Sequence, residues 1–209
     1  SSSSSSTSTV VVVGGCGRVG RLVVERLLLD DDASRPRVVR AMTRDGTSET
    51  ARRLRALGAE IVVGDATRED DCAEACRGAD AVVAAFGARR MSRARDAWRK
   101  VDDGEVEVDE THPRAINYLG VRRLVRCAER AGARRFVRVT GMSVGYPAFD
   151  WIAVLLNVVL SMTIKWQAAG ERAIRDACAG SKTMTYCVVR PGSLSDDARC
   201  AEDATGKKR

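Results

Sequence analysis

Residues 10–20 read VVVVGGCGRVG, and this stretch constrains the fold more than any other part of the chain. Four consecutive valines predict a buried strand of a parallel sheet. Glycines at positions 14, 15, 17 and 20 come next, and an apolar helical pattern begins at Leu22. Such glycines permit a tight turn, a close approach of the backbone to a pyrophosphate and close packing of helix on strand. The stretch therefore predicts a dinucleotide site; the alternative is a turn between strand and helix that binds nothing.

Strand-like and helix-like segments alternate along the rest of the chain, which predicts an α/β fold. We expect a Rossmann-like, doubly wound parallel sheet with helices on both faces. The later strands are expected at 37–43, 60–65, 80–86, 135–140 and 185–189, and the strand at 60–65, the third of the chain, is expected to be buried. The helices are expected from directly after the glycines to about 29, at 52–57, from about 68, at 113–132 and at 165–178.

The domain organisation is expected to be simple. Residues 10–197 form one NAD(P)-binding domain, preceded by a Ser/Thr tail at 1–9 that is too polar to pack and followed by a polar tail at 198–209. A highly charged excursion at 88–110 interrupts the alternation. It is interpreted as solvated filler or, alternatively, as a lid or partner-binding loop.

Composition excludes some classes of function. The net charge of +7 comes mostly from arginines scattered along helices, without the basic and aromatic platform that single-stranded nucleic acids need, so no nucleic-acid partner is expected. The seven cysteines show no CxxC spacing and only one histidine accompanies them, so no metal site is expected. We interpret the cysteines as buried free thiols of a protein in a reducing compartment.

The end of the second strand indicates which cofactor binds. An NAD site places a carboxylate there for the ribose 2′-hydroxyl, whereas an NADP site places an arginine for the 2′-phosphate. The residues are Thr43, Arg44 and Asp45, and the planar guanidinium of Arg44 suits a phosphate. Arg18 in the glycine loop is a second candidate cation. NADP is therefore predicted, with NAD as the alternative that Asp45 would serve.

Other strand ends supply further candidates. Asp65 is placed to accept a hydrogen bond from the exocyclic amine of the adenine or to cap the helix that follows. Phe86 is placed to line the ribose and nicotinamide side. Ser143 follows the fifth strand, where open α/β sheets place their active sites. The predicted cofactor-binding residues are Gly14, Gly15, Cys16, Gly17, Arg18, Val19, Gly20, Thr43, Arg44, Asp65, Ala66, Ala84, Ala85, Phe86, Gly87, Thr140 and Gly141.

Residues 150–165 form a strongly apolar block that is too short to span a bilayer, so no transmembrane segment is expected. A buried helix is the favoured interpretation. The alternative is a contact with another subunit or with a membrane surface through Trp151 and Trp166.

Several motifs in order resemble a known family. They are the glycine loop, the segment NYLG at 117–120, RFVRVTGMS at 135–143, ERAI at 171–174 and YCVVRPGSL at 186–194. Over about residues 10–197 the series resembles the NmrA-like branch of the atypical short-chain dehydrogenase/reductase superfamily. The resemblance implies a Rossmann sheet that binds NADP(H) or NAD(H). It implies reductase activity in some members, and cofactor sensing or assembly roles without turnover in others, several of them in plastids.

The chain departs from this family at the catalytic residues. Catalytic members carry a Tyr-x-x-x-Lys pair, in which the lysine lowers the pKa of the tyrosine that acts as general acid. Ser143 fits the family's serine, but the pair falls at Leu155 and Val159 in one register, and at Thr163 and Gln167 in the other.

The nearest residues of the right types are Tyr146 and Lys165, whose separation does not match the motif. Ser143 and Lys165 are the catalytic candidates, with Lys165 reaching the nicotinamide ribose. Only fifteen residues follow Leu194, which suggests a fragment or a reduced substrate site.

Two functions follow from these observations. The first is an NADP(H)-dependent oxidoreductase acting on an unidentified small molecule. The second is a non-catalytic, cofactor-binding regulatory or assembly factor with a protein partner. The free thiols, the Ser/Thr start and the resemblance to plastid members favour the chloroplast, with the cytoplasm as the alternative.

Overall fold

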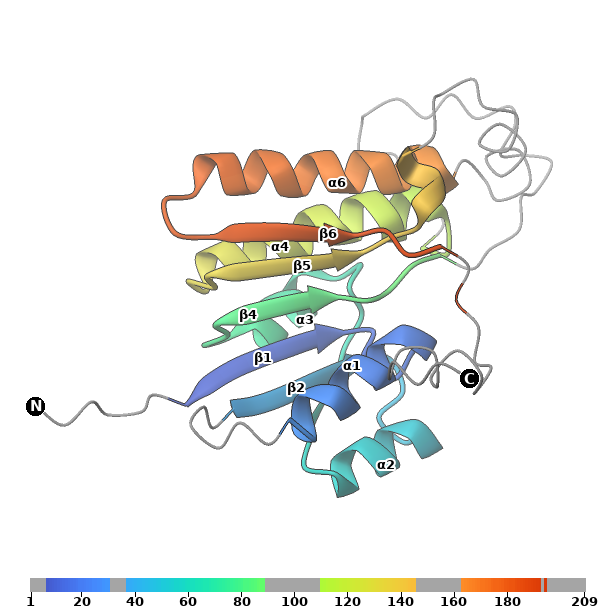
Figure 1. Ribbon diagram of the computed structural model, residues 1–209, viewed down its shortest axis with the longest axis vertical. Coiled ribbons are helices and arrows are strands. Elements are labelled where there is room, and N and C mark those ends of the chain that lie inside the picture. The colour runs from blue at the N-terminus through green and yellow to red at the C-terminus, as the bar shows by residue number, and fades with distance from the viewer. Residues whose placement is uncertain (1–6, 31–36, 89–109, 146–162, 193, 195–209) are drawn as a thin grey trace, which may run out of the picture.

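The computed structural model of the chain describes residues 7–30, 37–88, 110–145, 163–192 and 194. These residues form a sheet of six parallel strands in the order β3-β2-β1-β4-β5-β6, with helices on both faces (Figure 1). The predicted doubly wound α/β fold is confirmed. Most of the predicted terminal tails, of the charged excursion and of the apolar block lies outside the described residues.

The bounds of the elements agree closely with the expected ones. The strands are β1 (Ser8–Val13), β2 (Arg37–Thr43), β3 (Glu60–Val63), β4 (Ala81–Ala84), β5 (Arg135–Val139) and β6 (Thr185–Val189). The helices are α1 (Arg18–Leu28), α2 (Glu49–Ala56), α3 (Glu69–Cys76), the π-helix η2 (Arg114–Gly120), α4 (Val121–Arg130), the 3-10 turn η3 (Met142–Gly145) and α6 (Thr163–Gly180). α2 begins three residues before its predicted start because the Ser48 side chain accepts a hydrogen bond from the amide of Ala51 and caps the helix.

Two hydrophobic layers hold the helices against the sheet. Because successive side chains of a strand point to opposite faces, Val11 and Val13 pack under α3, α4 and α6, whereas Val12 packs under α1 and α2. The first layer contains Leu124 and Phe136, both fully buried. The central strand β1 therefore contributes to both layers, as its four valines predict.

The predicted burial of free thiols is confirmed at four positions and wrong at one. Cys72, Cys76, Cys127 and Cys178 are buried and unpaired. Burial raises the pKa of Cys72 and of Cys76 to about 12, so both thiols stay protonated at neutral pH. Cys187 is exposed, because β6 is an edge strand of the described sheet.

The third strand was expected to be buried, and this expectation is wrong. β3 lies at the opposite edge of the sheet, and Val63 is 65% exposed. An apolar run in the sequence indicates a strand but does not say whether it lies at the edge. Among the described residues, no helix combines the length and apolar character needed to cross a bilayer.

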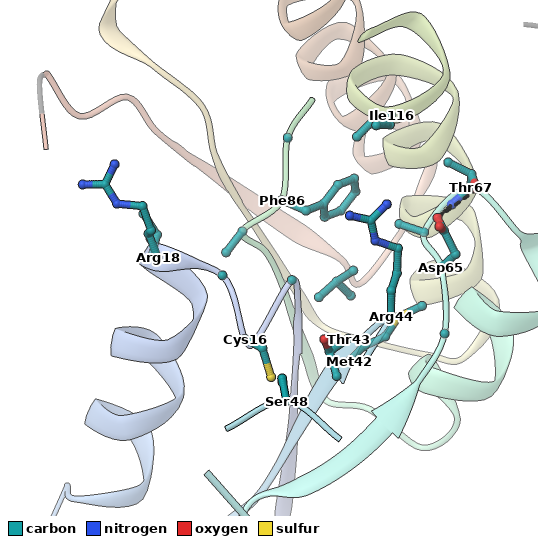
Figure 2. Close-up of a pocket in the computed structure, with 18 of the residues that line it drawn as sticks. Cys16, Arg18, Met42, Thr43, Arg44, Ser48, Asp65, Thr67, Phe86 and Ile116 are labelled. Carbon is teal, nitrogen blue, oxygen red and sulfur yellow. Dashed lines mark hydrogen bonds between the residues drawn. The ribbon is translucent and has the colours of Figure 1, made fainter. Parts of the chain in front are cut away.

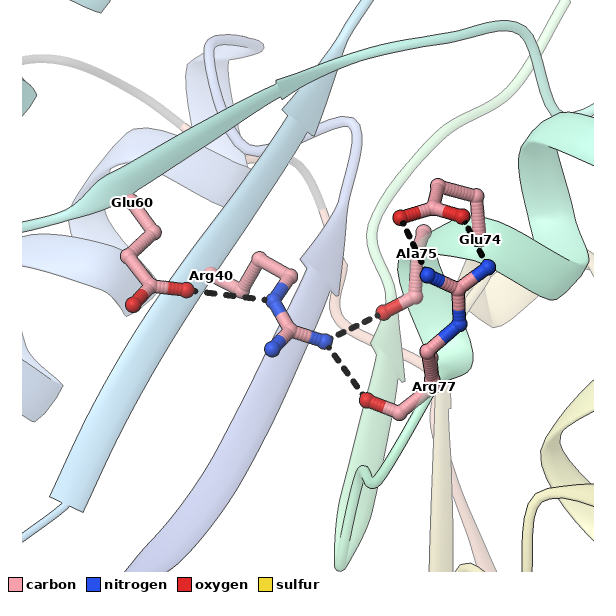
Figure 3. Close-up of polar contacts among 5 residues, drawn as sticks. All are labelled: Arg40, Glu60, Glu74, Ala75 and Arg77. Atoms are coloured by element: carbon pink, nitrogen blue, oxygen red, sulfur yellow. Dashed lines mark hydrogen bonds and ion pairs between the residues drawn. The ribbon is translucent and has the colours of Figure 1, made fainter.

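Arg40 ties the middle of β2 to the end of α3 (Figure 3). One guanidinium nitrogen donates to the carbonyls of Ala75 and Arg77, at 2.9 Å each. The Nε atom donates to the carboxylate of Glu60 at 3.2 Å. The last carbonyls of a helix have no partner within the helix, and a cation is favourable at that end. Arg40 therefore holds α3 against the sheet.

We expect Arg40→Met to lower the free energy of unfolding by about 2 kcal/mol, since it leaves the two carbonyls without their charged donor. Urea denaturation measures the change. Arg77→Met is the matched control, because it removes only an exposed ion pair with Glu74 and should cost less than about 0.5 kcal/mol. Equal losses in the two variants would contradict the role given to Arg40.

Candidate functional site

A groove with a volume of about 970 Å³ lies along the carboxyl ends of the strands (Figure 2). Its walls come from the glycine loop after β1, the end of β2, the loop between β3 and α3, and the end of β4. This is the edge at which open α/β sheets bind their ligands. The predicted cofactor residues that line the groove are Gly14, Cys16, Gly17, Arg18, Val19, Thr43, Arg44, Asp65, Ala66, Ala85, Phe86 and Gly87.

The glycine loop brings the start of α1 to this groove without side chains in between. Gly14 has a φ of +78°, a left-handed conformation that favours glycine. A Cβ atom on Gly20 would lie 2.0 Å from the Gly14 carbonyl oxygen, so α1 packs directly on the turn. No side chain caps α1, and its first turn holds no acidic residue. The amide groups of this helix end are thereby left to a bound anion.

Five predicted cofactor residues do not line the groove. Gly15 and Gly20 lie behind the loop, where a Cβ atom would clash, so they support the turn. Ala84 is fully buried in the core, and its prediction as a cofactor contact is corrected. Thr140 and Gly141 lie beyond the groove, and the Thr140 hydroxyl donates to the carboxylate of Glu171 at 2.8 Å.

At the end of β2 the arginine faces the groove and the aspartate does not line it. Arg44 extends from the strand end towards Phe86 and Asp65, whereas Arg18 points away from them (Figure 2). The carboxylate of Asp45 accepts hydrogen bonds from the Thr47 hydroxyl at 2.6 Å and the Thr47 amide at 2.8 Å. These bonds hold the pKa of Asp45 below its usual value. Its charge is therefore engaged in a local turn.

Asp65 lines the groove and also organises the turn before α3. One of its carboxylate oxygens accepts from the amide and the hydroxyl of Thr67, at 2.8 Å each. The residue at the cap position of α3 is Arg68, so the expectation that Asp65 caps this helix is wrong. The second carboxylate oxygen makes no hydrogen bond to the described residues.

The structure does not bring the two catalytic candidates to the groove. Ser143 lies in η3 after β5 and is not among the described residues that line it. Lys165 lies on α6 and lines a different groove, which also includes Tyr118 and Arg122. Its ammonium nitrogen is 4.9 Å from the centroid of the Trp166 ring. Tyr146 lies outside the described residues.

Asn117 lies beside Gly87 and Ala88 at the end of the groove and is not one of the predicted site residues. It is fully buried in η2, where its side-chain oxygen accepts from the Ala88 amide at 3.0 Å and its amide nitrogen donates to the Thr163 hydroxyl at 3.2 Å. A Cβ atom on Gly170 would lie 2.2 Å from the Asn117 carbonyl oxygen, so α6 packs tightly on the π-helix. An asparagine among apolar residues was the available signal, because a buried amide needs partners.

A buried carboxylate beyond β5 and β6 was also missed. Glu171 on α6 is 4% exposed and accepts from Thr140 and from the guanidinium of Arg190, including a bond of 3.1 Å from the arginine Nε. Glu171 raises the pKa of Arg190. The carboxylate is thus fully engaged by its own neighbours.

The groove thus combines a glycine loop, a helix start without a side-chain cap and an arginine at the end of the next strand. Comparisons of the sequence with known proteins agree with this arrangement. The model of a family described as NAD(P)H-binding matches residues 14–208. The chain belongs to this family. The groove lies at the edge of the sheet where Rossmann-like proteins bind their dinucleotides.

Individual relatives are distant. The chain is 27% identical over 157 residues to Protein TIC 62, chloroplastic, of Arabidopsis thaliana, a match that covers 75% of this chain and 21% of that protein. A short-chain dehydrogenase/reductase superfamily protein from Agrobacterium tumefaciens, solved with bound NAD, is 26% identical with a TM-score of 0.58 and covers 87% of this chain and 48% of that one.

A third relative is a putative NAD-dependent epimerase/dehydratase from Bacillus halodurans. It is 25% identical with a TM-score of 0.60, over 91% of this chain and 72% of that one. The predicted superfamily resemblance is confirmed. The chain spans about a fifth of the curated relative's length and about half of the Agrobacterium protein's.

We expect Gly20→Ala to destabilise the NAD(P)H-binding domain by about 2 kcal/mol or more, since the new Cβ would overlap the Gly14 carbonyl. Thermal unfolding measures the loss. Gly180→Ala is the control: nothing lies within 4 Å of its added Cβ, and it should leave stability unchanged or raise it by up to about 1 kcal/mol. A Gly20→Ala protein as stable as the control would refute the close packing of α1 on the turn.

Proposed function

We propose that the domain binds NADP(H) in preference to NAD(H), with Arg44 as the residue that recognises the adenosine 2′-phosphate. The supporting observation is the pairing at the end of β2: Arg44 lines the groove, while the carboxylate of Asp45 is held by Thr47. A ribose diol needs an acceptor there, and a phosphate needs a guanidinium fork. Arg44 offers this guanidinium fork.

The order of the strands supports one direction of the cofactor in this proposal. The adenosine half lies over the ends of β2 and β3, near Arg44 and Asp65. The pyrophosphate lies against the start of α1. The nicotinamide half follows over the end of β4, beside Ala85 and Phe86, because β4 is the strand on the other side of β1.

We further propose that the domain uses the bound cofactor as a regulatory signal or for assembly and does not turn it over. Reduction of a carbonyl needs a proton donor of suitable pKa. The described residues that line the groove include no tyrosine, lysine or histidine. Lys165 lies in the other groove. The similarity to a chloroplastic protein supports a location in the plastid.

An oxidoreductase is the second candidate, favoured by the sequence identity to a short-chain dehydrogenase/reductase superfamily protein. In that case the proton donor comes from the substrate, the solvent or a residue outside the described ranges.

We expect Arg44→Ala to raise the dissociation constant for NADPH by roughly ten- to a hundredfold, because a charge-assisted contact to the phosphate is lost. The dissociation constant for NADH should stay close to that of the unmodified chain. Fluorescence titration measures both. Arg53→Ala, which removes an exposed partner of Glu25 outside the groove, is the control and should change neither. Equal losses for the two nucleotides would refute the assignment of Arg44.

Titration with NADPH, followed by incubation with a panel of quinones and aldehydes, separates the two candidate functions. We expect binding without loss of NADPH absorbance. Steady oxidation of NADPH with any member of the panel would instead establish the oxidoreductase. If neither NADPH nor NADH binds, both candidates fail.

A further inference from the structure

Arg138 is a buried cation on β5 whose charge neither candidate function explains. The residue is only 1% exposed, and its Nη1 atom donates to the carbonyls of Ala84 at 3.3 Å and Phe86 at 2.7 Å. The guanidinium carbon lies 4.8 Å from the centroid of the Phe86 ring. The arginine thus holds the carbonyl of Ala84, the last residue of β4 and its own register partner, and the carbonyl of Phe86 in the loop that follows.

The partners of this arginine are all neutral. Among the described residues Arg138 makes no ion pair, and the carboxylate that influences it, Glu171, is already bound by Arg190 and Thr140. Burial lowers the pKa of Arg138 to about 10, so the side chain is still charged at neutral pH. A buried charge without a counter-ion is costly, and its field is weakly screened.

The charge lies behind one part of the dinucleotide groove. Phe86, which contacts the guanidinium, also lines the groove, together with its neighbours Ala85 and Gly87 (Figure 2). This wall belongs to the nicotinamide half in the orientation proposed above. The adenosine half, by contrast, has Arg44 at its own end of the groove.

We propose that Arg138 is a specificity-determining residue that makes the site favour the reduced cofactor over the oxidised one. The oxidised nicotinamide ring carries a positive charge, and the reduced ring is neutral. A fixed positive charge behind Phe86 therefore opposes only the oxidised form. Arg138 acts through Phe86 and through the field it creates, without touching the cofactor.

This inference rests on the proposed binding of NADP(H) and adds a preference for one redox form of the cofactor. A domain that binds NADPH more tightly than NADP⁺ is occupied according to the ratio of the two in its compartment.

The test is the ratio of the dissociation constants for NADP⁺ and NADPH, measured by calorimetry. We expect the unmodified chain to bind NADPH more tightly. In Arg138→Met, which keeps the length of the side chain and removes the charge, the ratio should fall by roughly three- to tenfold. Arg138→Lys keeps the charge and should keep most of the preference for NADPH.

A purely structural role of Arg138 predicts a different outcome. Loss of the bonds to Ala84 and Phe86 would then weaken both nucleotides in parallel and leave the ratio unchanged. A folded Arg138→Met protein with an unchanged ratio would overturn the inference, and so would an unmodified chain that binds the two forms equally. Failure to bind either form would instead reject the proposed function.

Glu171→Gln provides a second variant in case Arg138→Met does not fold. It removes the negative charge that faces Arg138 while keeping an acceptor for Thr140 and Arg190. The local charge becomes more positive, so the preference for NADPH should increase by roughly threefold or more. A ratio that stays the same or moves towards NADP⁺ would also overturn the inference.

Discussion

The contact between the start of α1 and the turn after β1 is the constraint on which the rest of the site depends. The helix approaches so closely that a single Cβ on Gly20 would overlap the carbonyl of Gly14. This approach aims the N-terminal amides of α1 along the carboxyl edge of the sheet, where their partial positive charge favours an anion. β1 is central in the sheet, so the groove extends from it over β2 on one side and over β4 on the other.

Two carboxylates near this groove, those of Asp45 and Glu171, are engaged by neighbouring side chains, whereas two arginines near it make no ion pair with them. Asp45 is held by Thr47, and Glu171 by Arg190 and Thr140, so neither carboxylate is available to a ligand. Arg44 lines the groove at the end of β2. Arg138 lies behind the other end, held only by carbonyls and an aromatic ring. The position of each arginine relative to its nearest carboxylate thus matters more than the net charge of the chain.

Most of the fold could be predicted because its elements are encoded locally. The bounds of β2 and β6 match the expected ones, and the other strands are shorter by a few residues or begin two residues earlier. The failures share a physical cause. The exposure of Val63 and of Cys187 depends on which strands lie at the edges, and the burial of Ala84 depends on the layer packed above it. Order and layering across a sheet are properties of segments far apart in the chain, and local patterns do not contain them.

The sequence by itself determined the strand, glycine loop and helix beside the groove, and the arginine at the end of the next strand. Each of these is a relation between residues close together in the chain, where steric rules leave few conformations. Only the tertiary structure decided that Lys165 faces a second groove and that Arg138 reaches Phe86, a residue 52 positions away. Such contacts arise when strands distant in sequence become neighbours in a sheet, because the sheet, and not the local pattern, sets which side chains meet.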